Sequence, residues 1–136
     1  CPLSPLLFAI VIEPLANCIC GDALMRGFEW GLECHDDISL YADDILIFMD
    51  HYNESGPRAL QILRVFGSHT GLLINLHKSL VHPLAGNGDN LEWARGLKIQ
   101  IEGFKYLGVC ITNTQSVAWS RNLQPVLDKM VTDLRS

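Results

Sequence analysis

The stretch Ile38–Phe48 reads ISLYADDILIF, and it places two adjacent carboxylates between two short apolar runs. Runs of this length and composition predict two strands, and the residues from Tyr41 to Asp44 predict the tight turn of a hairpin between them. Anionic side chains are costly beside buried strands unless a cation binds them. The stretch therefore predicts a metal site at the tip of a hairpin.

Asp43 and Asp44 are adjacent, and adjacent residues of a strand point to opposite faces. A turn breaks this alternation, so both carboxylates can reach the same side of the sheet. Oxygen ligands suit Mg²⁺, which binds well together with substrate phosphates, and two such ions can activate a hydroxyl and stabilise a leaving pyrophosphate. The alternative is an exposed tip without a ligand, which is how we interpret the similar pair Asp36-Asp37.

Working outward from the hairpin, the sequence predicts alternating helices and short strands. Before and including the hairpin, we expect a helix over 5–20 with Ser4 as its N-cap, a weak strand within 26–30, a polar turn at 35–37 and the hairpin itself over 38–49. After it, we expect a loop over 50–57, a helix over 59–66 that ends within 67–71, a strand over 72–76 and a loop over 84–90. The rest of the chain predicts a helical turn at 91–94, strands over 99–101 and 104–111 joined by a turn at 102–103, and a helix over 121–134. This order predicts an α+β fold in which an antiparallel sheet carries helices on one face. It contains no glycine fingerprint for dinucleotide binding.

The composition is that of a globular protein. Hydrophobic residues make up 49% of the 136 residues and charged residues 18%, which suits one domain with a core. The formal net charge of −5 argues against a free-standing nucleic-acid binder. Five cysteines at irregular spacing predict reduced thiols. The apolar run over 2–20 is interrupted by Glu13, Pro14 and Asn17, which predicts a buried helix and no membrane span.

Four motifs in order resemble those of reverse transcriptases. The start of the chain, CPLSPLLF at 1–8, resembles the family's motif B, and Tyr41-Ala42-Asp43-Asp44 resembles motif C. Phe66-Gly67, together with the residues at 71, 74–75 and 78–79, resembles motif D. The stretch FKYLGV at 104–109 resembles motif E. In detail the chain looks most like a LINE-type (non-LTR, L1-like) retrotransposon reverse transcriptase, an RNA-directed DNA polymerase.

The resemblance implies a partial polymerase palm over residues 1–118, followed over 119–136 by the first helix of a thumb or connection. It implies that Asp43 and Asp44 are catalytic and hold two Mg²⁺ ions in the complete enzyme. It places Tyr41 near the primer terminus or nascent pair, and residues Pro2 and Ser4 near the incoming nucleotide and template. The partners it implies are an RNA template, a DNA primer and dNTPs.

Several of these residues have simpler interpretations that stay open. Ser4 is a good helix cap whether or not it contacts substrate, and Tyr41 could pack in the core. Lys78 could protonate pyrophosphate, as a motif D lysine is proposed to do in polymerases, but a solvated charge is the preferred interpretation.

The resemblance begins inside motif B, and the family's first catalytic aspartate belongs to motif A, which precedes it. We therefore expect a palm fragment that lacks an N-terminal fingers and palm segment and is inactive alone. The alternative is a non-catalytic relic of a retroelement with no selected function. By analogy with the family, the site of action is nuclear DNA after cytoplasmic assembly on RNA, and we expect no secretion.

Overall fold

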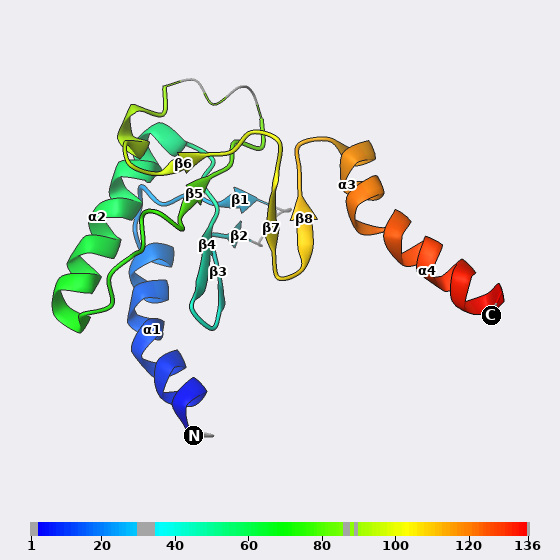
Figure 1. The fold of residues 1–136 in the computed structure, drawn as a ribbon. Coiled ribbons are helices and arrows are strands. Elements are labelled where there is room, and N and C mark those ends of the chain that lie inside the picture. Colours follow the sequence, from blue (N-terminus) through cyan, green and yellow to red (C-terminus); the bar gives the residue numbers. More distant parts are fainter. Residues whose placement is uncertain (1–2, 30–34, 86–87, 89, 136) are drawn as a thin grey trace. The chain divides into compact units, whose positions relative to one another are not determined.

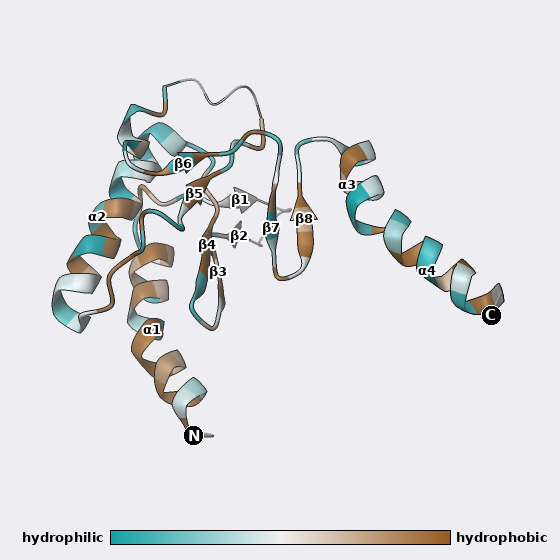
Figure 2. Cartoon of the chain, viewed as in Figure 1, coloured by the Kyte–Doolittle hydropathy of each residue, from teal (hydrophilic) through white to brown (hydrophobic). Residues whose placement is uncertain are grey.

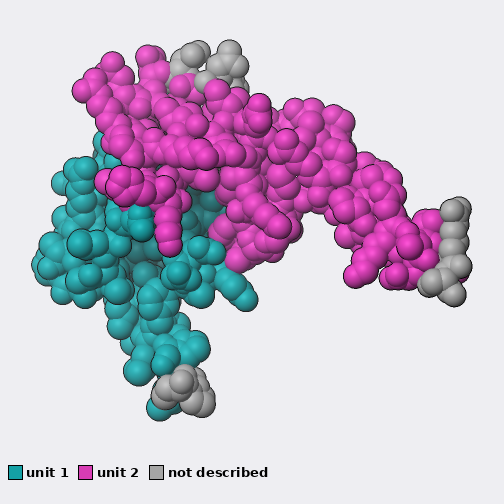
Figure 3. All heavy atoms as spheres, viewed as in Figure 1, with its two compact units in different colours: residues 1–75 teal, residues 76–136 magenta. Residues whose placement is uncertain are grey.

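A computed structural model describes residues 3–29, 35–85, 88 and 90–135. The chain divides into two compact units, residues 1–75 and residues 76–136 (Figure 3), and each is described here by itself. The division into a palm at 1–118 and a thumb helix at 119–136 stays a prediction. Pro2, which we expected near the incoming nucleotide, lies outside the described residues.

The first unit begins with the helix α1, Ser4–Cys20 (Figure 1). Its buried residues Ile12, Leu15 and Ile19 recur at helical spacing and form one apolar stripe. The predicted helix is confirmed, but the predicted cap is wrong: Leu3 is the N-cap and no side chain caps the helix. Ser4 is already helical because Pro5, with its fixed φ, suits the first turn.

The hairpin predicted around the paired aspartates is confirmed. Strand β3, Ile38–Tyr41, pairs antiparallel with β4, Asp44–Ile47. One face of this ribbon packs against the core that α1 supplies, and its residues are Ile38, Leu40, Ile45 and Ile47. They alternate along each strand with residues of the opposite face, as strand geometry requires. The helices of this unit therefore lie behind one face of the hairpin.

Helix α2, Tyr52–Thr70, begins seven residues earlier than the sequence suggests, because the predicted loop over 50–57 is mostly helical. Tertiary contacts explain the difference. Ser55 is fully buried and its Oγ donates to the backbone oxygen of Leu24 at 2.6 Å, while its N–H donates to His51 O at 2.9 Å. The helix ends where predicted, at Gly71, whose φ of +77° suits a glycine.

A second difference lies in the segment before the first hairpin. The predicted weak strand is β1, Phe28–Glu29, and it pairs with β2, His35–Asp36, where we expected only a polar turn. Backbone pairing does not need apolar side chains, so composition alone gave no signal for β2.

The first strand of the second unit is β5, Leu80–Val81, which pairs in parallel with β6, Lys98–Ile99. The chain between these two strands contains the short 3₁₀ helix η1, Glu92–Ala94. The predicted helical turn is confirmed by η1. The strand predicted over 72–76 is wrong, because the described backbone there is irregular. The hairpin predicted with its turn at 102–103 is also wrong, because β6 pairs with β5.

The second hairpin instead consists of β7, Phe104–Tyr106, and β8, Val109–Ile111. Two helices follow it, α3, Gln115–Asn122, and α4, Gln124–Arg135, in place of one predicted helix over 121–134. Pro125 explains the break at Leu123, since its ring has no N–H to donate and clashes with the carbonyl one turn earlier. Figure 2 shows the alternation of hydrophobic and hydrophilic residues along α4.

The α+β class is confirmed, since the chain combines helices with small sheets. The single antiparallel sheet is not: the described part of the chain forms four two-stranded sheets, one of them parallel. The strands have two to four residues, too short to extend the hydrogen-bonded ladder far. Among the described residues, no helix has the length and hydropathy needed to span a membrane.

Candidate active site

The paired aspartates lie at the tip of the β3–β4 hairpin. Tyr41 pairs with Asp44, so the turn consists of Ala42 and Asp43. Ala42 has a φ of +50°, a left-handed conformation that is strained for a residue with a Cβ atom. Strain of this kind persists where the surrounding structure enforces it, and it is enriched at functional sites.

The tip faces away from the helices of its unit. Because Leu40 and Ile45 pack against the core, the alternation of the strands turns the next pair, Tyr41 and Asp44, to the opposite face. Both aspartates are exposed, and Tyr41 is 62% exposed. Packing in the core, the simpler interpretation of Tyr41, is therefore wrong, and the tip presents an aromatic ring beside two carboxylates.

The donor set at this tip suits magnesium. Mg²⁺ is usually held by one or two carboxylates, with waters and substrate phosphates completing its octahedral shell, and such a site must be open to the substrate. Exposed Asp43 and Asp44 meet both requirements. Within the described residues, no group of three or more His, Cys, Asp or Glu side chains gathers at any point. Among the described residues, the tip therefore carries two consecutive exposed carboxylates and belongs to no larger group of such ligands.

The other predicted site residues lie elsewhere. Ser4 is exposed in the first turn of α1. Lys78 is exposed in the turn before β5, and it belongs to the second unit, whereas the aspartates belong to the first.

The tip of the β7–β8 hairpin is strained as well. Leu107 and Gly108 form its two-residue turn, and both have positive φ, +48° and +86°. These signs are those of a type I′ turn, which favours Asn-Gly and which leucine disfavours. Leu107 is 48% exposed, so packing of its side chain offsets little of the free-energy cost of this backbone conformation. An exposed leucine on a strained backbone makes this tip a second candidate contact site.

Two residues at the end of α3 reach this hairpin, and the sequence alone did not identify them. The Asn122 side chain accepts a hydrogen bond from Cys110 N at 2.7 Å and donates one to Cys110 O at 2.8 Å. Arg121 Nη1 lies 3.5 Å from the backbone oxygen of Glu102. The available signal was Pro125, which places a helix end here, but nothing in the sequence identified the strand that the helix end meets.

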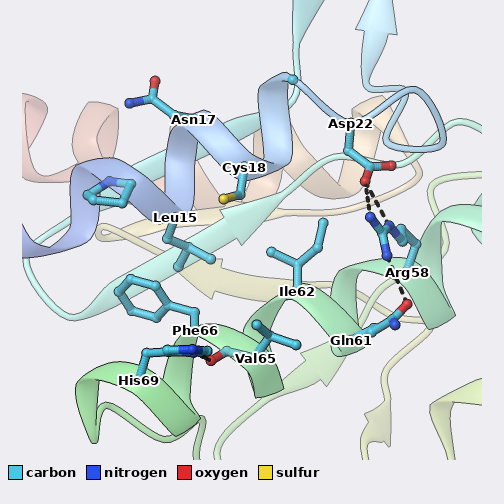
Figure 4. A pocket seen from close by; sticks show the side chains of 12 residues that line it. Leu15, Asn17, Cys18, Asp22, Arg58, Gln61, Ile62, Val65, Phe66 and His69 are labelled. Carbon is cyan, nitrogen blue, oxygen red and sulfur yellow. Dashed lines mark hydrogen bonds and ion pairs between the residues drawn. The ribbon is translucent and has the colours of Figure 1, made fainter.

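A groove of about 570 Å³ lies between α1 and α2 in the first unit (Figure 4). Its floor is apolar, with Leu15, Ile62 and Phe66 among the lining residues. At one end, Arg58 Nε and Nη2 donate to Asp22 Oδ2 at 2.7 and 2.6 Å. This hydrogen bonding holds the pKa of the Asp22 carboxyl below its ordinary value. The groove carries no reactive cluster among these residues, and we interpret the ion pair as structural.

The comparison with protein families gives the site its context. Residues 1–111 match the sequence profile of a family described as reverse transcriptase (RNA-dependent DNA polymerase). The match contains both hairpins, the exposed aspartates of the first and the strained tip of the second. It also covers well over half of the 136 residues. The chain therefore belongs to the reverse transcriptase family of RNA-dependent DNA polymerases.

Proposed function

We propose that this chain is the palm segment of a LINE-type (non-LTR, L1-like) retrotransposon reverse transcriptase, in which Asp43 and Asp44 hold the catalytic magnesium. Reverse transcriptases are generally dependent on divalent metal, and they act on a template, a primer and dNTPs. The observation that carries the proposal is the hairpin tip, where Asp43 and Asp44 are exposed and where Tyr41 and Asp44 lie on the face away from the helices.

The residues of the tip have separable roles in this proposal. Asp43, in the turn, and Asp44, at the start of β4, supply oxygen ligands from two consecutive positions of the tip. Two bound Mg²⁺ ions would activate the primer hydroxyl and neutralise the leaving pyrophosphate. Tyr41 offers a flat, exposed ring on the same face as Asp44, suited to stacking against the terminal base pair.

The remaining parts of the proposal concern the substrates. Ser4, at the start of α1, and Pro2 would lie near the incoming nucleotide and template. The β7–β8 hairpin would grip the primer through its exposed tip at Leu107. Lys78 is exposed and remains a candidate proton donor to pyrophosphate. RNA template and DNA primer are the proposed polymer partners.

A metal-binding experiment tests the central proposal without requiring activity. Mn²⁺ is a paramagnetic substitute for Mg²⁺ that broadens the NMR signals of nearby amides. We expect titration of the chain with Mn²⁺ to broaden first the signals from residues 41–45, and the double variant Asp43→Asn, Asp44→Asn to lose this effect.

Asp50→Asn is the matched control, because its side chain is 62% exposed and lies in the same unit, after the end of β4. It should leave the broadening unchanged. Broadening that starts elsewhere, or that survives the double substitution, would contradict a metal site at the hairpin.

A further inference from the structure

The outer edge of the β7–β8 hairpin carries a pair of backbone groups that no strand of the hairpin can satisfy. Tyr106 and Val109 form the closing pair next to the two-residue turn, and Cys110 lies opposite Lys105 in the next pair. In an antiparallel ribbon, hydrogen-bonded and non-hydrogen-bonded pairs alternate. The N–H and C=O groups of Cys110 therefore point away from β7, toward the free edge of β8.

Asn122 satisfies both of these groups. Its Oδ1 accepts from Cys110 N at 2.7 Å, and its Nδ2 donates to Cys110 O at 2.8 Å. A carboxamide offers one acceptor and one donor in the arrangement of a peptide group. The side chain therefore takes the place that a neighbouring strand would occupy, and it closes a sheet edge that is otherwise open to pairing.

Arg121 strengthens the same connection from the preceding position. Its Nη1 lies 3.5 Å from the backbone oxygen of Glu102, just before β7, and 3.7 Å from Cys110 Sγ. Two consecutive residues at the end of α3 thus contact the hairpin, one at the segment entering β7 and the other on β8. A two-stranded hairpin is marginally stable by itself, so contacts of this kind decide how firmly it is held.

We propose that Asn122 is a positioning residue: its carboxamide fixes the β7–β8 hairpin to α3, so that both meet a primer–template duplex as one rigid part. The part of this proposal that concerns the duplex rests on the proposed function. The part that concerns the hairpin and helix does not. Asn122 acts through the hairpin, whose strained tip at Leu107 is the group offered to the duplex.

The first experiment measures the connection directly by NMR. In the unsubstituted chain we expect a scalar coupling across the hydrogen bond between Cys110 N and Asn122 Cγ, together with slow hydrogen exchange at the Cys110 amide. Asn122→Leu retains bulk but removes both hydrogen bonds, and it should speed this exchange by about tenfold. The amide of Ile111, which faces β7, should change far less.

Ser120→Ala is the matched control in α3, since its Oγ donates to Val117 O of its own helix. It should leave Cys110 exchange unchanged. Absence of the coupling together with fast Cys110 exchange in the unsubstituted chain would overturn the proposal without any variant. Equal Cys110 exchange in Asn122→Leu and the unsubstituted chain would also overturn it.

The second experiment tests the duplex. Fluorescence anisotropy with a labelled RNA–DNA primer–template should show binding weakened about fivefold by Asn122→Leu, because binding must then order a loosened hairpin. Ser120→Ala should bind normally, and Mn²⁺ binding at residues 41–45 should be unchanged in both variants. Equal affinities would overturn the functional half of the proposal. Failure of the unsubstituted chain to bind any duplex would overturn the proposed contact between the β7–β8 hairpin and the duplex, while the NMR result still decides the role of Asn122.

Discussion

At the scale of single residues, charge placement distinguishes the site from the scaffold. Asp43 and Asp44 are exposed at a turn, whereas Asp22 is largely covered, with 13% of its side chain exposed. Asp22 Oδ2 accepts from Arg58, and its Oδ1 accepts from Leu24 N at 3.0 Å. Asp22 thus joins α2 to the loop after α1, and its carboxylate is stabilised in the folded state.

This placement predicts a pH dependence. The pKa of Asp22 is below its ordinary value of 3.8, chiefly because Arg58 donates hydrogen bonds to it. A lowered pKa contributes stability that is complete above the ordinary value and is lost as the pH falls through the folded-state value. Asp22→Asn should therefore lower the urea midpoint at pH 7, and this difference from the unsubstituted chain should shrink as the pH falls below about 4.

Asp50→Asn removes an exposed carboxylate of the same unit and serves as the control, with no change expected at either pH. Arg58→Gln removes the other partner and should reproduce the pH-dependent loss. A deficit of Asp22→Asn that stayed constant down to acid pH would show that the pair contributes by packing and not by charge.

At the scale of helices and strands, the sequence predicted those elements that a local residue pattern determines. The hairpin at 38–47 was predictable because two apolar runs enclose a short turn, and α1 because its apolar residues recur at helical spacing. Composition suggested a loop at 50–57, but burial of Ser55 and Gly56 makes it helical. The pairing of β5 with β6 joins distant segments, and no local pattern specifies such a partner.

The second hairpin was misplaced for a related reason. The sequence suggested its turn at Glu102-Gly103, where glycine is present, but the turn lies at Leu107-Gly108. Gly103 does not form the turn of this hairpin and has a packing role instead. Its φ is +115°, and a Cβ atom there would lie 2.5 Å from the backbone oxygen of Ile111 and 2.7 Å from Thr112 Cγ2. This glycine permits close approach of the chain to the end of β8.

A paired substitution separates that packing role from backbone strain. Gly96 also has a positive φ, +93°, but a Cβ atom there would meet no other atom within 4 Å, so Gly96→Ala reports strain alone. Gly103→Ala should lower the free energy of unfolding by a further ~1–3 kcal/mol, the usual cost of overpacking. Urea unfolding of both variants measures the difference, and equal losses would mean that the approach to Ile111 relaxes freely.

At the scale of the whole molecule, the net charge and the ligands at the hairpin tip both indicate that this chain needs further residues for catalysis. A net charge of −5 gives the chain little general attraction for nucleic acid, since phosphate contacts supply most of that affinity. The described residues hold two adjacent carboxylates at an open tip, and no third acidic, cysteine or histidine side chain joins them in a cluster. In the proposed two-metal reaction, a further carboxylate must complete the site.

We therefore expect this chain alone to incorporate no nucleotide on an RNA template with a DNA primer, in either Mg²⁺ or Mn²⁺. Two carboxylates can hold a cation weakly, but positioning two ions for in-line transfer requires ligands that bridge them. Primer extension should give no more product than Asp43→Asn, while an active reverse transcriptase on the same substrate verifies the assay. Extension by the unsubstituted chain that Asp43→Asn abolishes would show that this chain completes the centre by itself, with a ligand from residues outside the described ranges or from a second copy.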